Sequence, residues 1–236
     1  MKPKQAATVI LLRPAERQGF EVFLTRRPDA IEFLGGMYCF PGGTVHKEDC
    51  ADAMLRQCHG LTPNQARTIA GARFGPREAL GIWVAAIRKL FEEAGILLAR
   101  PESGDRLTPQ LNGAGRLTER HGALTRKAIS FQALLESENL LCDLSSLGYF
   151  SYWQTPSQFA MRFDTRFFIA RLPDDQMPLG TTPEVARSVW LTPDNALQLF
   201  AKGELPMIFP TFASLRTLAD FATIEYLLKA YSKQDS

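Results

Sequence analysis

The sequence predicts an α/β fold in one domain, with a mixed sheet between helices. Short β-rich runs at Ala6 to Leu12 and Glu21 to Thr25 predict strands near the start of the chain. A long apolar-patterned segment from Pro76 to Ala94 predicts a helix, and Met161 to Leu172 predicts a later strand. At 236 residues the chain is long enough to bury a substantial core in a single domain.

The first elements are separated by recognisable turn and capping residues. Arg13 to Gly19 reads as a hairpin-like connection between the first two strands. Thr62 followed by Pro63 predicts an N-cap with proline at the first helical position, and Gly71 is expected to end that short helix.

The long helix is expected to begin at Pro76 and to end before Gly95, which suits a left-handed cap. Its buried stripe follows 3, 4, 7 spacing. Glu92 and Glu93 lie off that stripe, and Lys89 is on their face because it is three and four residues before them. The residues of the stripe are Trp83, Ile87, Leu90, Phe91 and Ala94.

The second half of the chain predicts a loop and further helices. The loop is Pro101 to Arg120, and the helices are Thr125 to Glu138, Pro193 to Ala201 and Pro210 to Tyr231. In the first of these helices, Glu136 and Glu138 are expected to be solvated. The apolar face of the last helix either covers the sheet or forms a homodimer contact, and the sequence does not decide between them.

Two separated segments, one from Phe40 to Asp49 and one from Arg88 to Ile96, together resemble the signature of the Nudix hydrolases, G-x5-E-x7-R-E-U-x-E-E-x-G-U, in which U is aliphatic. The first runs from Phe40-Pro41-Gly42-Gly43 to Asp49, which stands where the signature has Glu. The second runs from Arg88 to Ile96. The spacer, Cys50 to Ile87, is longer than the signature's by roughly 31 residues, which is tolerable if its ends lie close together.

The resemblance implies the Nudix α/β/α sandwich with a mixed sheet and extra helical insertions. The whole chain, residues 1–236, is then a single Nudix domain. One helical insertion is expected at about 50–80, within the signature, and another at about 100–150. Helices at 62–72 and 125–138 are candidates for a cap over an acyl or pantetheine chain.

The resemblance also assigns site residues. Glu92, Glu93 and Gly43 are the expected metal ligands, and Asp49 is expected to hold Arg88 in place. The catalytic set is therefore Glu92, Glu93 and Arg88. Mg²⁺ or Mn²⁺ is the implied cofactor, because a hard cation takes oxygen ligands, neutralises a diphosphate and lowers the pKa of a bound water.

Lys89 departs from the signature, which has Glu at that position. Three interpretations stay open. The enzyme works with fewer helix ligands and borrows an acid from elsewhere, it is slow or unusually metal-dependent, or the domain binds without hydrolysing. The candidate borrowed acids are Glu136, Glu138, Asp164 and Glu184.

Upstream residues resemble the coenzyme A diphosphatase branch, L-L-T-x-R-[SA]-x3-R-x3-G-x3-F-P-G-G. Leu24, Thr25, Arg27, Gly36 and Phe40 to Gly43 are in register, whereas Pro28 and Glu32 depart from it. Arg26 and Arg27 are candidates for bidentate phosphate contacts, and Gly42 and Gly43 for close backbone approach to the substrate. Trp153 to Pro156 and Arg162 to Phe168 resemble long-insert members of the acyl-coenzyme A branch.

Composition excludes several other classes. A net charge of +2 without a basic run argues against a nucleic-acid partner. Nothing approaches a membrane span, and four cysteines without zinc or disulfide spacing fit a reducing compartment, so the cytoplasm is expected.

The implied function is metal-dependent hydrolysis of coenzyme A or acyl-coenzyme A to 3′,5′-ADP and (acyl-)4′-phosphopantetheine. One alternative is a Nudix-fold nucleotide sensor with weak or no hydrolysis, because Lys89 replaces an acid. Another is a pyrophosphatase for ADP-ribose or dinucleotides. The partner is a small nucleotide in each case.

Overall fold

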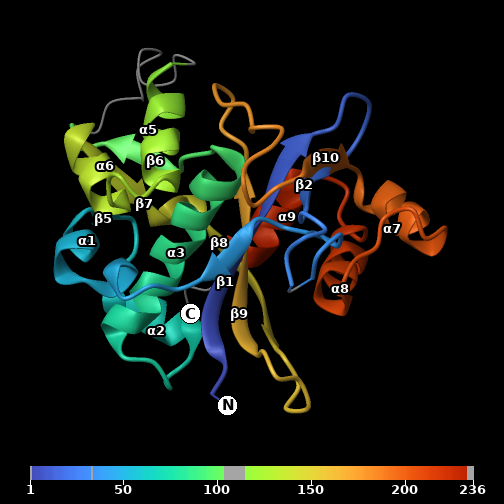
Figure 1. Cartoon of the computed structure of the whole chain (residues 1–236), viewed down its shortest axis with the longest axis horizontal. Coiled ribbons are helices and arrows are strands. Elements are labelled where there is room, and N and C mark those ends of the chain that lie inside the picture. The colour runs from blue at the N-terminus through green and yellow to red at the C-terminus, as the bar shows by residue number, and fades with distance from the viewer. Residues whose placement is uncertain (1, 33, 104–114, 233–236) are drawn as a thin grey trace.

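The computed structural model describes residues 2–32, 34–103 and 115–232. It places a mixed sheet between two helical layers (Figure 1). Strands β1 and β9 are parallel and the other pairs of this sheet are antiparallel. The predicted α/β/α sandwich is therefore confirmed. The strand order is β10 (Arg187–Leu191), β2 (Phe20–Arg26), β1 (Lys4–Pro14), β9 (Phe163–Arg171) and β8 (Gly148–Gln154), with β3 (Tyr38–Cys39) beside β2 and β4 (Gly42–Thr44) beside β1.

Alternate side chains of β1 enter two separate cores, as expected for a strand covered on both faces. Val9 and Leu11 pack with the helices on the left of Figure 1, whereas Ile10 and Leu12 pack with those on the right. The left layer holds α1 (Asp52–Arg56), α2 (Pro63–Ala70), α3 (Pro76–Ala94), α5 (Arg116–Thr125) and α6 (Phe131–Ser137), and the right layer holds α7 (Pro193–Ala201), α8 (Phe209–Leu218) and α9 (Ile224–Ser232).

The boundaries of α2 and α3 agree with those predicted. Thr62 forms a capping box with Gln65, in which the side chain of each accepts from the backbone amide of the other. Helix α3 starts at Pro76 and stops at Gly95, whose φ of 71° is left-handed. The predicted stripe is buried, but so is nearly every other side of α3, because strands and helices surround it.

A small second sheet was not predicted. It joins β5 (Cys58–His59), β7 (Leu140–Asp143) and β6 (Ala99–Pro101), and short 3-10 helices lie at Glu48–Cys50 (η1) and Leu144–Ser146 (η2). The sheet links the segments expected as two insertions. Its strands are two to four residues long, too short for a period of two to stand out.

The predicted helix from Thr125 to Glu138 is confirmed only from Phe131 to Ser137 and is wrong before it. Helix α5 ends at Thr125, Lys127 takes a left-handed φ of 57°, and Ser130 caps the separate helix α6. The predicted loop from Pro101 to Arg120 is wrong where α5 begins, at Arg116, while residues 104–114 lie outside the described residues.

The predicted single helix from Pro210 to Tyr231 is also wrong. It is two helices, because the Thr223 hydroxyl accepts from the amide of Tyr226 and caps α9 after a break. Leu215, Leu218 and Leu227 are fully buried in the second core. The apolar face of this region therefore covers the sheet.

Candidate active site

The Gly42–Gly43 turn lies against α3, and both glycines are closely approached, Gly42 by backbone and Gly43 by the Lys89 side chain. A Cβ on Gly42 would lie 2.5 Å from the Ala7 carbonyl oxygen, and one on Gly43 would lie 2.7 Å from Lys89 Cε. Glycine at both positions therefore lets strand β4 pair with β1 while side chains of α3 reach across it.

Arg88 is fixed in the position expected for it. Its Nε and Nη2 donate to Asp49 Oδ1 and Oδ2 at 2.7 and 2.8 Å, so the predicted contact between these residues is present as a buried bidentate pair. The guanidinium also donates to the Thr44 carbonyl oxygen at 2.9 Å and to Glu92 Oε1 at 2.9 Å. Arg88 thus ties α3, the turn and η1 together.

Lys89 occupies the centre of an acidic cluster. Its Nζ lies 2.9 Å from Glu92 Oε2, 3.4 Å from Glu93 Oε1 and 2.9 Å from Glu184 Oε2. Burial alone would lower the pKa of this ammonium, but the carboxylates of Glu93, Glu92 and Glu184 outweigh burial and raise it. Lys89 is therefore a fixed cation at neutral pH.

Glu93 differs from Glu92 in its surroundings. Glu93 is buried, whereas two adjacent glutamates near the end of a helix are usually exposed to solvent. Burial raises its pKa to about 7, with repulsion from Glu184 adding to the effect and the Lys89 ammonium opposing it. For Glu92, burial is outweighed by Lys89 and Arg88, so its pKa is lowered. The two adjacent carboxyls therefore ionise at different pH values.

Four acids were candidates to replace the carboxylate that is missing at Lys89, and Glu184 lies in the cluster. Glu136 is exposed on α6. Glu138 was expected to be solvated, and that is wrong: its side chain is buried and pairs with Arg116 and Arg120. Asp164 belongs to a different cluster, in which it pairs with Arg73 and Arg166.

The two arginines proposed for phosphate differ in position. Arg26 is half-exposed and pairs with Asp29 at 2.6 Å, so it is turned toward its own loop. Arg27 lies near the acidic cluster, where its charge lowers the pKa of both Cys39 and Glu93 against larger effects of burial. Arg27 therefore acts electrostatically on Glu93, whereas Arg26 is paired with Asp29.

One contact of the site has no signal in the sequence. The His121 Nε2 lies 2.8 Å from the Glu92 carbonyl oxygen, and the ring packs edge-on against Phe91. His121 is on α5 and forms no motif with the residues of α3. Its role in supporting the end of α3 depends on packing between the two helices.

The donor set fits a hard divalent cation. Glu92, Glu93 and Glu184 offer carboxylate oxygens beside the turn. Glu93 Oε1 is buried and makes no hydrogen bond among the described residues, although the Lys89 ammonium lies 3.4 Å away, and a metal ion would coordinate it. In the described part of the chain no group of three acids, histidines or cysteines is ready to hold a metal. The ammonium of Lys89 stands between the carboxylates, so metal and lysine compete.

Comparison with known proteins identifies the family. Residues 3–218 match the family model described as the NUDT19 Nudix domain. Acyl-coenzyme A diphosphatase NUDT19 of Gallus gallus is 28% identical, with 96% of this chain and 70% of the relative covered. The protein of that name from Homo sapiens is 26% identical, with 92% and 65% covered, so this chain spans about two thirds of each relative.

A solved structure shows the same fold. The crystal structure of a NUDIX hydrolase from Alicyclobacillus acidocaldarius has a TM-score of 0.75 at 24% identity, covering 97% of this chain and 96% of that one. The family match covers residues 3–218 and so includes both α3 and the Gly42–Gly43 turn. It belongs to the NUDT19 Nudix domain family of Nudix pyrophosphohydrolases.

Proposed function

We propose that the protein hydrolyses coenzyme A or acyl-coenzyme A to 3′,5′-ADP and (acyl-)4′-phosphopantetheine. The observation that carries the proposal is the convergence of Glu92, Glu93 and Glu184 beside the Gly42–Gly43 turn. The names of the relatives, acyl-coenzyme A diphosphatases, support the class of substrate. The register of Arg27 with the coenzyme A pattern supports it further.

In this proposal the three carboxylates hold Mg²⁺ or Mn²⁺. The chemistry that the ion supplies, when bound, is charge neutralisation on the diphosphate and activation of water. Arg88, locked by Asp49, keeps the Glu92 carboxylate in place through its 2.9 Å contact. Arg27 is assigned to a phosphate oxygen, and the Gly42 amide fixes Glu93 by donating to Oε2 at 3.2 Å.

A product assay tests the proposal. The purified protein is incubated with coenzyme A, acetyl-coenzyme A, ADP-ribose and NADH, each in Mg²⁺ and in Mn²⁺. Glu93→Gln removes a buried carboxylate of the cluster, and Glu136→Gln makes the same change at an exposed position on α6. We expect 3′,5′-ADP from coenzyme A, its loss in Glu93→Gln, and no change in Glu136→Gln.

Other outcomes redirect the assignment. Faster cleavage of ADP-ribose or NADH than of either coenzyme A substrate would replace the substrate class while keeping the chemistry. Release of 3′,5′-ADP at equal rates in wild type and Glu93→Gln would remove Glu93 from the site.

Lys89 motivates a second candidate, a nucleotide-binding domain that does not hydrolyse. Its ammonium already neutralises part of the acidic cluster, with two contacts at 2.9 Å. In this case wild type binds little Mg²⁺ or Mn²⁺ and cuts none of the substrates, and Lys89→Glu creates activity. An active wild type that gains nothing from Lys89→Glu would eliminate this candidate.

Two sequence-based expectations stay predictions. Among the described residues, no helix has the length and apolar character needed to cross a membrane. A cytoplasmic location is checked by cell fractionation, and a homodimer by light scattering of the purified protein.

A further inference from the structure

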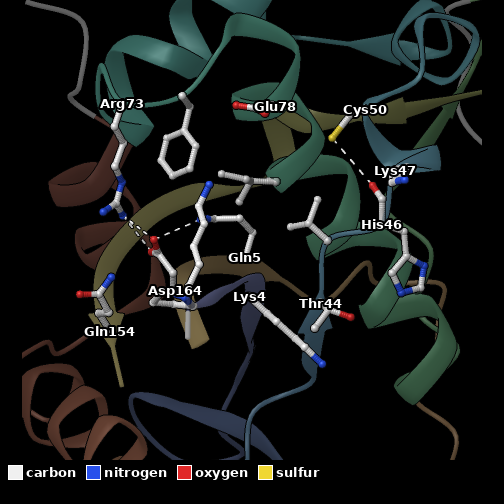
Figure 2. Close-up of a pocket in the computed structure, with 15 residues that line it drawn as sticks. Lys4, Gln5, Thr44, His46, Lys47, Cys50, Arg73, Glu78, Gln154 and Asp164 are labelled. Atoms are coloured by element: carbon white, nitrogen blue, oxygen red, sulfur yellow. Dashed lines mark hydrogen bonds and ion pairs between the residues drawn. The ribbon is translucent and has the colours of Figure 1, made fainter. Parts of the chain in front are cut away.

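A cavity of about 740 Å³ lies next to Thr44, the last residue of β4 (Figure 2). In the figure, Arg73 and Asp164 lie on its left, His46, Lys47 and Cys50 on its right, and Gln5 between them. The remaining wall comes from the start of β1, the N-terminal half of α3 and the ends of β8 and β9. The Nudix signature does not account for this cavity.

The wall of the cavity is cationic. Lys2, Lys4 and Lys47 line it, and among the described residues none of the three has an ion-pair partner. Two acids, Glu78 and Asp164, also line it, but the charge of Asp164 is more than neutralised, because it pairs with Arg73 at 2.8 Å and with the buried Arg166. Such a surplus of positive charge favours an anion.

Arg73 is preorganised rather than free. Its guanidinium carbon lies 5.0 Å from the ring centroids of both Phe74 and Tyr152, and that of Arg166 lies 4.6 and 4.4 Å from the same two rings. The Arg73 side chain is still 46% exposed. It therefore presents donors toward the cavity without the full cost of ordering a mobile side chain.

Gln5 adds a buried acceptor that needs a hydrogen-bond donor. Its Nε2 donates to Asp164 Oδ2 at 3.2 Å, while its Oε1 is buried and has no hydrogen-bond partner among the described residues. A buried acceptor without a donor is costly. Gln5 lines the cavity, so a small rotation of its amide would bring Oε1 to a hydroxyl or amino group of a ligand, and the cavity suits a phosphate carried on a sugar or nucleoside.

The cavity lies close to the acidic cluster. Glu78 and Ile82 of α3 line it, and Lys89 is two turns after Ile82 on the same helix face, about 10 Å along the axis. Strand β4 connects the two places, since Gly43 packs on Lys89 and Thr44 lines the cavity. One ligand with two phosphate groups can therefore reach both.

We propose that this cavity binds the phosphate monoester of the substrate, which for a coenzyme A molecule is the 3′-phosphate on the ribose. The proposal rests on the function proposed above. In coenzyme A the ribose separates this phosphate from the diphosphate, and its remaining hydroxyl or the adenine amino group is the donor for Gln5. Lys4 and Lys47 contact the phosphate as point charges, and Arg73 contacts it through its planar fork.

The test compares coenzyme A with 3′-dephospho-coenzyme A. Lys4→Gln/Lys47→Gln removes two exposed cations, and Lys202→Gln at the end of α7 is the matched control. We expect the double variant to lose about tenfold in kcat/KM for coenzyme A and less than twofold for the dephospho substrate, with the control unchanged. Equal losses on both substrates, or no loss on either, would overturn the proposal.

Binding measurements separate this proposal from the proposed hydrolysis. By calorimetry, 3′,5′-ADP should bind the double variant about tenfold more weakly, whereas 5′-AMP should bind both proteins equally. If the purified protein shows this difference in binding but cuts no substrate, the cavity still binds the 3′-phosphate, and the proposed hydrolysis is wrong. If inorganic phosphate binds in the cavity and the double variant keeps its preference for coenzyme A, the site takes a free anion and the substrate assignment falls.

Discussion

Two ionic clusters of this protein, each built around a buried residue, carry opposite surpluses of charge. Around Lys89, three carboxylates face one ammonium, with Arg88 and Asp49 balancing each other alongside. Around Asp164, two guanidiniums share one carboxylate. Unmatched buried charge is costly, so each cluster would be stabilised by a ligand of the opposite charge. Under the two proposals above, this difference lets a chain of net charge +2 bind a cation at one place and a phosphate at another.

The clusters also differ in the exposed fraction of their arginine side chains. The side chain of Arg88 is 5% exposed and that of its partner Asp49 is 3% exposed. Arg73 is 46% exposed although Asp164 is buried. Removing a partner should therefore be much more damaging in the first cluster, because exposed pairs contribute little.

The largest expected effect is that of Arg88→Met on stability. The substitution leaves Asp49 buried without its bidentate partner, so we expect a loss of about 4 kcal/mol in the free energy of unfolding. Urea denaturation measures it, with Arg73→Met as the matched control at about 1 kcal/mol or less. Similar losses in the two variants would show that burial does not distinguish the clusters.

The next effect is a pH dependence carried by Glu93. Its pKa is about 7 in the folded, metal-free protein and about 4.5 in the unfolded chain, so the folded state keeps the proton up to a higher pH. Stability therefore falls as pH rises from about 4.5 to about 7, by at most about 3 kcal/mol. The measurement is thermal unfolding in a chelating buffer across this range.

Glu93→Gln isolates this contribution because it keeps the shape and removes the titration. The variant should gain stability over wild type as pH rises through the same window and should match it most closely below pH 4.5. A constant difference between the two proteins at every pH would mean that folding leaves the pKa of Glu93 unchanged.

The sequence predicted the helix α3, which carries part of the candidate site. Proline at the start, the apolar stripe and Gly95 at the end are local features, and they gave both boundaries of the helix. The contact between Arg88 and Asp49 followed from the family resemblance despite the long spacer. Local patterning and a shared signature were sufficient for these features.

Contacts between distant segments were not predictable in the same way. Lys89 and Glu184 are 95 residues apart, and Arg73 and Asp164 are 91 apart. Glu138 was misjudged because its charge is matched by two arginines of α5, where a loop was expected. One signal was available: Asp164 and Arg166 are two apart on a strand, which puts them on one face.

A smaller effect is expected from Lys89→Met on metal affinity. The substitution removes the ammonium that lies 2.9 Å from both Glu92 and Glu184, so Mn²⁺ no longer competes with it. We expect Mn²⁺ to bind about tenfold more tightly by calorimetry, equivalent to about 1.4 kcal/mol. Lys47→Met is the control, since it removes an exposed lysine outside the acidic cluster. Weaker binding in Lys89→Met would show that the lysine orders the carboxylates instead of competing for them.

The smallest effect is that of Arg73→Gln on phosphate binding. With one guanidinium left for Asp164, the second cluster becomes neutral, and its attraction for an anion falls. We expect 3′,5′-ADP to bind about threefold more weakly, with a smaller dependence on salt concentration because one cation is lost. Arg67→Gln on the exposed side of α2 is the control. If Arg73→Gln leaves both the affinity and its salt dependence unchanged, the surplus charge around Asp164 serves the fold alone, and the contrast between the two clusters does not extend to their ligands.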